Sequence, residues 1–217
     1  MTGTYVFISI LFIVIIILKS PWFKGWIGEM EINVITKLFL NKDTYHLIRN
    51  VVIPADGGTT QIDHIIVSRF GVFVVETKNL KGWIFGKEGD AYWTQKIFRH
   101  SEKFQNPLRQ NYKHTKTLGE ILGIPDDKMR SVIVFTGDST FKTEMPENVT
   151  RPGGYIRYIR SKTNPVLTDG EVAQLIRSIA GKRLAPGLET HFRHVKHVKD
   201  IKVGKQRLES SDRVKRS

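Results

Sequence analysis

Two apolar segments joined by a short turn constrain the fold of this chain more than any other feature. Residues 60–67 and 72–78 are rich in Val, Ile and Phe, and the four residues from Ser68 to Gly71 separate them. Ser at the first position and Gly at the last are typical of a tight turn. We therefore expect a β-hairpin in which Ser68 pairs with Gly71.

Three charged side chains lie on this predicted hairpin. Its register places Asp63 opposite Glu76, and because side chains alternate along a strand, Glu76 and Lys78 share a face. The surrounding apolar runs are typical of strands covered on both faces, where carboxylates without a cationic partner cost free energy. A divalent metal between the acids is the favoured interpretation. A cross-strand salt bridge on a solvated face is the alternative, but it predicts strict apolar–polar alternation.

The charge balance narrows the classes of partner. The 217 residues include 34 Lys and Arg against 21 Asp and Glu, a formal net charge of +13. Such an excess favours nucleic acid or the anionic face of a membrane. Cysteine is absent, which excludes disulfides and thiolate metal sites and gives no support to an oxidising compartment.

The N-terminal segment is almost wholly apolar. Residues 1–18 carry no charged side chain, and about 18 residues is near the lower limit for crossing a bilayer. We expect a single-pass anchor in the cell membrane, with the rest of the chain in the cytoplasm because Lys19 and Lys24 follow the segment. A signal peptide would show a basic leader and a cleavage site, which are not visible; a buried core helix is the other alternative. Aromatic residues suited to the headgroup region follow: Trp22, Phe23 and Trp26.

The remaining pattern predicts helices and strands in a mixed order. We expect helices at 25–40, at 107–122 and from Thr168 to about 181, and strands at 45–53, 82–86, 91–93, 130–136 and 155–159. The helix ends are indicated by Pro107, Gly123 and the capping box that begins at Thr168. A helix, a three-stranded meander, a helix and a strand indicate an α/β domain.

Three parts are expected along the chain: an N-terminal anchor at 1–20, an α/β domain at 21–186 and a basic tail at 187–217. From His191 the tail holds 9 Lys and Arg against 3 Asp and Glu. We expect a frayed helix or disorder there, with contacts to nucleic acid or anionic lipid. Three histidines recur in the tail without an acid or Cys at ligand spacing, which does not favour zinc: His191, His194 and His197.

Four short motifs occur in order: Gly28-Glu29, Ile62-Asp63-His64, Glu76-Thr77-Lys78-Asn79 and Asn106-Pro107-x-x-Gln110. Together they resemble the nuclease-related domain (NERD), placed in the PD-(D/E)XK superfamily of metal-dependent nucleases alongside the Mrr-type restriction enzymes. The similarity covers about residues 25–136. It implies a restriction-endonuclease-like α/β core, a mixed central sheet flanked by helices, here preceded by the predicted transmembrane helix.

The resemblance implies four catalytic residues: Glu29, Asp63, Glu76 and Lys78. Ile62 stands where the superfamily name has proline, a departure that the nuclease-related branch generally shows. Glu31 is a second carboxylate on the first helix, but it points to a different helical face and is kept only in reserve.

Hydrolysis of a phosphodiester needs an activated water and stabilisation of charge on the phosphate. We expect Asp63 and Glu76 to bind Mg²⁺ or Mn²⁺, because such hard cations take carboxylate oxygens while keeping several waters. Lys78 would position or deprotonate the attacking water and offset the developing charge. Glu29 would hold a further water or a second metal; one metal or two stays open.

Basic and aromatic residues interleave after the hairpin, a mixture suited to phosphate contacts with some stacking. An ordinary solvated helix face is the alternative. The expected nucleic-acid-binding residues are Lys96, Arg99, Lys103, Arg109, Gln110 and Lys113. The family motif favours Gln110 as close to the catalytic residues, whereas His64 is expected to face the other way and to pack.

The sequence thus favours a membrane-anchored, metal-dependent nuclease that acts on DNA rather than RNA. A non-catalytic module that binds nucleic acid or another partner is the first alternative, and the intact set of Asp63, Glu76 and Lys78 argues against it. A membrane-surface scaffold held by the basic tail is the second, and it predicts lipid binding indifferent to the acids.

Overall fold

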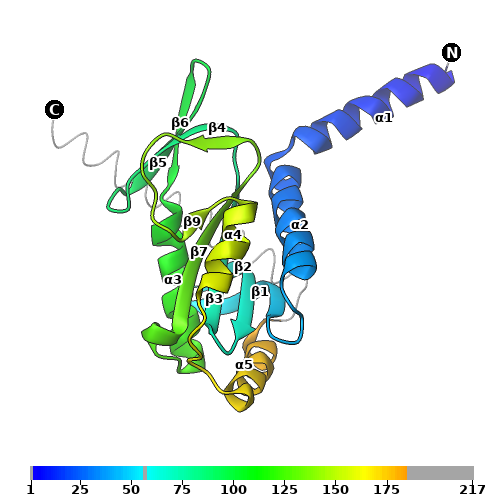
Figure 1. Cartoon of the computed structure of the whole chain (residues 1–217). Coiled ribbons are helices and arrows are strands. Elements are labelled where there is room, and N and C mark those ends of the chain that lie inside the picture. The colour runs from blue at the N-terminus through cyan, green and yellow to red at the C-terminus, as the bar shows by residue number, and fades with distance from the viewer. Residues whose placement is uncertain (1, 56–57, 185–217) are drawn as a thin grey trace.

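A five-stranded mixed sheet forms the centre of the computed structural model, which describes residues 2–55 and 58–184 (Figure 1). Its strand order is β1 (His46–Ala55), β2 (Gly58–Ser68), β3 (Gly71–Asn79), β7 (Met129–Thr136) and β9 (Val149–Thr150). The first three strands are antiparallel, whereas β3, β7 and β9 run parallel. The predicted hairpin is present, with Ser68 paired to Gly71.

Helices cover both faces of this sheet. On one face, α3 (Pro107–Leu122) and α5 (Asp169–Lys182) pack on a cluster that includes Ile65, Val67, Val72 and Val74. On the other, α2 (Pro21–Phe39) and α4 (Pro152–Ser161) pack on Ile66, Phe73 and Val75. The chain is therefore α/β, with a mixed sheet flanked by helices. The continuous apolar runs of β2 and β3 follow from burial on both sides.

A second, four-stranded sheet lies at one end of the first. Its order is β6 (His100–Gln105), β5 (Tyr92–Ile97), β4 (Gly82–Phe85) and β8 (Ser139–Phe141). Stacked rings of Trp93 and Phe135, with centroids 6.1 Å apart, join it to β7 of the main sheet. A short 3₁₀ helix, Asp126–Lys128, precedes β7.

The alternation of side chains along β1 and β2 is reset at one point. Ile62 and Ile65 pack in the same cluster although they are three positions apart, a spacing that regular alternation places on opposite faces. The reset falls at Asp63, and the facing residue Asn50 has a left-handed backbone with φ of 50°. Asp63 therefore lies where its strand changes face.

The helix ends follow the sequence signals. Asn106 caps α3 by accepting a hydrogen bond from the Leu108 main chain, and Gly123 ends α3 with φ of 65°. Thr168 and Glu171 form the capping box of α5. The predictions of helices at 107–122 and from Thr168 are confirmed.

Several predicted elements differ in the structure: the helix expected at 25–40 begins at Pro21, and the strand expected at 91–93 runs from Tyr92 to Ile97. The prediction of a strand at Tyr155–Ile159 is wrong, because these residues lie in α4 and present Tyr155, Ile156 and Ile159 to the core. β1 runs through Pro54 rather than ending before it. Because β1 is an edge strand, a missing N–H on its outer side costs no ladder bond.

The N-terminal helix α1 (Thr2–Lys19) points away from the sheets (Figure 1). Within residues 2–55 and 58–184, none of the helices taken singly has the length and hydrophobicity of a membrane span; α1 and α2 reach both only together, as segments Tyr5–Lys19 and Phe23–Phe39 with a 62° bend between them. The expectation of a single transmembrane helix at 1–20 therefore finds no support. The predicted basic tail, including His191, His194 and His197, lies outside the described residues.

Candidate active site

Glu76 on β3 is a buried carboxylate held between two nitrogen groups. Lys78 donates from Nζ to Oε1 of Glu76 at 2.7 Å, and Nε2 of His114 lies 3.4 Å from Oε2. Lys78 also donates to Oε1 of Gln110 at 2.9 Å. Residues from β3 and α3 thus form one connected polar cluster inside an otherwise apolar layer.

Asp63 lies where β2 and β3 part. The paired residues of the two strands end at His64 and Val75. Beyond that point, the main-chain N–H of Thr77 donates to Oδ2 of Asp63 at 2.9 Å. The Asp63 carboxylate therefore takes the place of a main-chain acceptor at the edge of the Glu76 cluster.

The two hairpin acids respond to this setting in opposite directions. Burial and the neighbouring charge of Glu76 raise the pKa of Asp63 well above its usual range. Burial also acts to raise the pKa of Glu76, but Lys78 and His114 outweigh it and the pKa of Glu76 is lowered. Negative charge is therefore concentrated on Glu76.

Glu29 approaches this cluster from α2. Burial raises its pKa, and the charge of Glu76 raises it further, so the two carboxyl groups are electrostatically coupled. The preceding Gly28 lets α2 come this close. A Cβ at Gly28 would stand 2.6 Å from Oγ1 of Thr136 on β7 and 3.0 Å from Cβ of Asn79 on β3.

Asn111 fixes α3 over the junction of β3 and β7. Its Nδ2 donates to the main-chain oxygen of Val74 and to Oγ of Ser131, both at 2.8 Å. Gln110 and His114, on either side of it in sequence, are thereby held above β3. His64 lies on the opposite face, as expected, with Nε2 3.1 Å from Oδ1 of Asn33 on α2. Burial lowers the pKa of His64 to about 4, so its ring is neutral at pH 7.

Asp63 on β2 and the Glu76-x-Lys78 motif on β3 lie at the same end of the hairpin, and α2 brings Gly28-Glu29 beside them. These are the motifs on which the family resemblance was based. The model of the nuclease-related domain family matches residues 24–136, just over half of the chain. The chain belongs to the nuclease-related domain family. An uncharacterized protein of Bacillus anthracis is 49% identical over 100 residues, 45% of this chain and 46% of that protein. The chain thus spans less than half of this relative's length. No solved structure matches this chain.

Within this nuclease-related domain, the predicted nucleic-acid-binding residues are spread over two places. Lys96 on β5, Arg99 in the β5–β6 turn and Lys103 on β6 are exposed on the second sheet. On α3, Arg109 donates to the Gly89 carbonyl and Lys113 is exposed. Only Gln110 of the six reaches the catalytic candidates, through Lys78.

Two residues at the site were not predicted from the sequence. His114 touches Glu76, and its Nδ1 lies 2.8 Å from Oγ1 of Thr60 on β2. His114 follows Gln110 by four residues, and side chains at this spacing share one face of a helix. That spacing, applied to Gln110, was the available signal; nothing in the sequence singles out Thr60.

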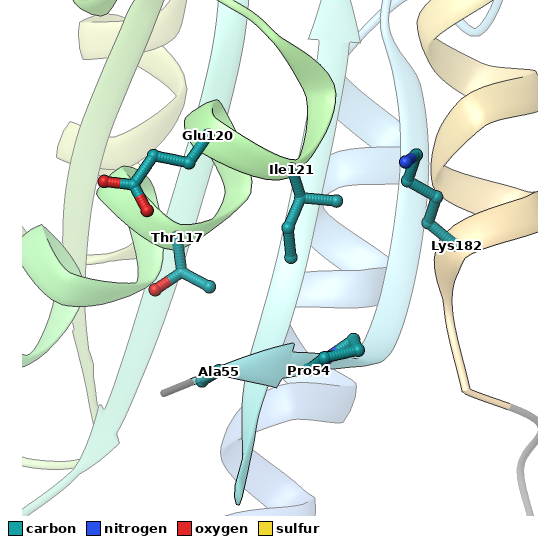
Figure 2. A pocket seen from close by; sticks show the side chains of 6 residues that line it. All are labelled: Pro54, Ala55, Thr117, Glu120, Ile121 and Lys182. Atoms are coloured by element: carbon teal, nitrogen blue, oxygen red, sulfur yellow. The ribbon is translucent and has the colours of Figure 1, made fainter. Parts of the chain in front are cut away.

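A hollow of about 480 Å³ lies beside the C-terminal half of α3 (Figure 2). It is lined by Pro54, Ala55, Thr117, Glu120, Ile121 and Lys182. None of the catalytic candidates of the nuclease-related domain lines it, so this hollow is separate from the polar cluster around Glu76.

The side chains suit a hard divalent cation in chemical type. Asp63 and Glu76 offer carboxylate oxygens, and burial first, with the charge of Glu76 second, raises the pKa values of Asp63 and Glu29; a bound cation would favour their ionised forms. In the described part of the chain, however, no three His, Asp or Glu side chains form a cluster ready to hold a metal ion. Both oxygens of Glu76 contact nitrogen groups instead.

Proposed function

We propose that this nuclease-related domain is a metal-dependent phosphodiesterase that hydrolyses DNA rather than RNA. The supporting observation is the buried, ionised Glu76, held against Lys78 and coupled to two carboxyl groups of raised pKa. Perturbed acids beside a lysine are typical of catalytic sites. The net charge of +13 supports a polyanionic substrate.

Each of the four catalytic candidates would have a separate role in phosphodiester hydrolysis. Asp63 and Glu76 would hold Mg²⁺ or Mn²⁺, which supplies charge stabilisation at the phosphate and a more acidic water. Lys78 is held at a fixed position by Glu76 and Gln110, so its Nζ meets the charge that develops on the phosphate without rearrangement. Glu29, whose pKa is raised, orients a water from the side of α2.

The test is cleavage of labelled single-stranded, duplex and branched DNA, and of RNA, with Mg²⁺, Mn²⁺ or EDTA. Glu76→Gln removes a metal ligand and should abolish cleavage. Lys78→Ala should lower the rate by about 10²- to 10³-fold, by analogy with the loss of one such donor. Glu31→Gln and Lys37→Ala, at exposed positions on α2, are the matched controls. DNA affinity in EDTA should change little in all four variants and fall steeply with salt.

A non-catalytic binding module is the second candidate, favoured by the engagement of both Glu76 oxygens and by the lack of a ready metal cluster among the described side chains. The same assay separates the two. Wild-type protein that binds DNA in EDTA but cuts no substrate with any divalent metal would establish the second candidate and exclude the first.

We also propose that α1 attaches the domain to the cell membrane, that residues 21–186 lie in the cytoplasm, and that the basic tail at 187–217 contacts nucleic acid or lipid. The support is that the apolar side chains from Tyr5 to Leu18 are exposed rather than packed on the sheets. Residues 5–19 carry this attachment, and the domain begins after the 62° bend that separates them from α2. Flotation of the full-length protein with vesicles tests it.

A further inference from the structure

The second sheet has one covered face and one uncovered face. Ile84, Trp93 and Phe104 point from the covered face into a cluster with Phe135 of the main sheet. Because side chains alternate, the residues between them in each strand point the other way. Among the described elements, no helix or strand packs on that second face: its side chains belong to none of the hydrophobic clusters.

The uncovered face combines aromatic and basic side chains. Trp83 pairs with Lys96 in the register of β4 and β5, and both are exposed, Trp83 by 48%. Tyr92, 40% exposed, and Lys103 lie on the same face of the β5–β6 pair. Nζ of Lys142 lies 4.7 Å from the centre of the Trp83 ring. Aromatic and basic side chains thus occur on this face in three neighbouring strands, β4, β5 and β6.

The tip of the β5–β6 hairpin ends this face with a strained apolar residue. Phe98 has φ of 51°, a left-handed backbone that a bulky side chain rarely adopts, and it is 94% exposed. A hollow of about 420 Å³ opens beside it, and its lining includes Lys81, Trp83, Lys96, Phe98 and the carboxylate residue Asp138. That volume lies within the range of small-molecule pockets and so admits a nucleotide-sized group.

The second sheet is joined directly to the elements of the candidate active site. β4 begins at Gly82, shortly after β3 ends at Asn79. β6 ends at Gln105, next to Asn106, which caps the helix that carries Gln110. The second sheet therefore begins just after the end of β3 that carries Lys78 and ends just before α3.

We propose that the uncovered face of the second sheet binds single-stranded nucleic acid. Trp83 stacks on a base, Lys96, Lys103 and Lys142 contact phosphates, and Phe98 limits the platform at the hairpin tip. Single strands fit better than duplex because a duplex keeps its base faces stacked inside, whereas exposed rings on a sheet need free base faces. This inference rests on the proposed function in one respect, that the ligand is a nucleic acid. It adds that the uncovered face binds the single-stranded form.

The experiment measures binding of a labelled 15-mer of thymidylate to full-length protein in EDTA, by anisotropy and by tryptophan fluorescence. Trp83→Ala should weaken binding at least about fivefold, as expected for loss of one stacked base. Trp26→Ala on α2, where the residue is 47% exposed, is the matched control and should bind normally. The oligonucleotide should quench wild type and Trp26→Phe, but quench Trp83→Phe much less.

Two further measurements, competition with unlabelled DNA and binding to lipid vesicles, test whether the face prefers single strands. Unlabelled single strand should displace the probe at lower concentration than duplex of the same length. Equal displacement by duplex, or equal affinity of the Trp83→Ala and Trp26→Ala proteins, would overturn the proposal. So would a change in Trp83 emission caused by phosphatidylserine vesicles but not by the oligonucleotide, which would assign this face to the membrane. Because no cleavage is needed in EDTA, an inactive protein that passes these tests would overturn only the nuclease proposal.

Discussion

Nε2 of His114 lies 3.4 Å from Oε2 of Glu76, so a helix and the central hairpin share one buried carboxylate. The other ring nitrogen of His114 is 2.8 Å from Oγ1 of Thr60, which fixes the ring between α3 and β2. Together with Lys78, this contact keeps the pKa of Glu76 below its usual range despite burial. The histidine thus helps to keep the acid ionised.

Replacing His114 with Ala should shift the pH profile of cleavage. Without the imidazole, one of the groups that lower the pKa of Glu76 is lost, so Glu76 protonates at higher pH. The acidic limb of the rate profile should therefore move to higher pH, with a smaller change in rate at the plateau. His46→Ala, at the start of β1, is the control. An acidic limb that stays in place would show that His114 only packs.

Asp63→Asn should stabilise the protein in the absence of metal. The pKa of folded Asp63 is raised above its unfolded value, so ionising it costs folding free energy above the folded pKa. This cost disappears as the pH falls through the folded pKa toward about 4, the unfolded value. The variant should melt a few degrees higher than wild type at neutral pH, and the difference should vanish in acid.

Thermal melts with and without Mg²⁺ measure this effect, with Asp43→Asn at an exposed position as the control. Added Mg²⁺ should raise the melting temperature of wild type but not of Asp63→Asn, because a ligand stabilises the state that binds it. A variant that melts below wild type at neutral pH and gains from Mg²⁺ would contradict both the electrostatic cost and the metal assignment.

Gly28→Ala should destabilise the domain, whereas Gly25→Ala on the same helix should not. A Cβ at residue 28 would meet Oγ1 of Thr136 at 2.6 Å, but at residue 25 it meets nothing within 4 Å. We expect a loss of about 1–3 kcal/mol for the overpacked site and a gain of up to about 1 kcal/mol at Gly25 from helix propensity. Denaturant unfolding measures both. Equal stabilities would mean that α2 is not seated on β3 and β7 as described.

Deleting residues 1–18 should leave a folded protein. The truncation keeps Ser20, whose Oγ accepts from the Phe23 main chain and caps α2. The exposed apolar side chains of α1 leave with it, so solubility without detergent should rise. Circular dichroism and a melting curve within a few degrees of the full-length protein would confirm this expectation. Loss of cooperative melting would instead assign α1 to the folded core.

Local sequence signals correctly predicted the β2–β3 hairpin and the ends of α3. The turn residues at Ser68 and Gly71 set the register, and Asn106 and Gly123 mark the ends of α3 because each satisfies main-chain groups that any helix leaves open. These are interactions between near neighbours in the chain, which a sequence displays directly.

Long-range packing explains what sequence reasoning missed. The aromatic and β-branched residues of α4 favour a strand locally, but burying Tyr155 and Ile159 against the main sheet requires a helix. The polar strand β6 is held by the contact of Phe104 with Trp93, which no local pattern encodes. Thr60 reaches the site only through a histidine 54 residues away.

The left-handed backbone of Asn50 predicts that some substitutions on β1 should abolish cleavage. Asn50 faces Asp63, and the change of face that aims this acid occurs in both strands together. A residue with a branched side chain at position 50 resists that backbone at a cost of order 1–3 kcal/mol. An unbiased screen for loss of cleavage should therefore return substitutions on β1, a strand that contributes no polar side chain to the described cluster. The backbone of Asn50 on β1 thus helps to set the direction in which the Asp63 side chain points.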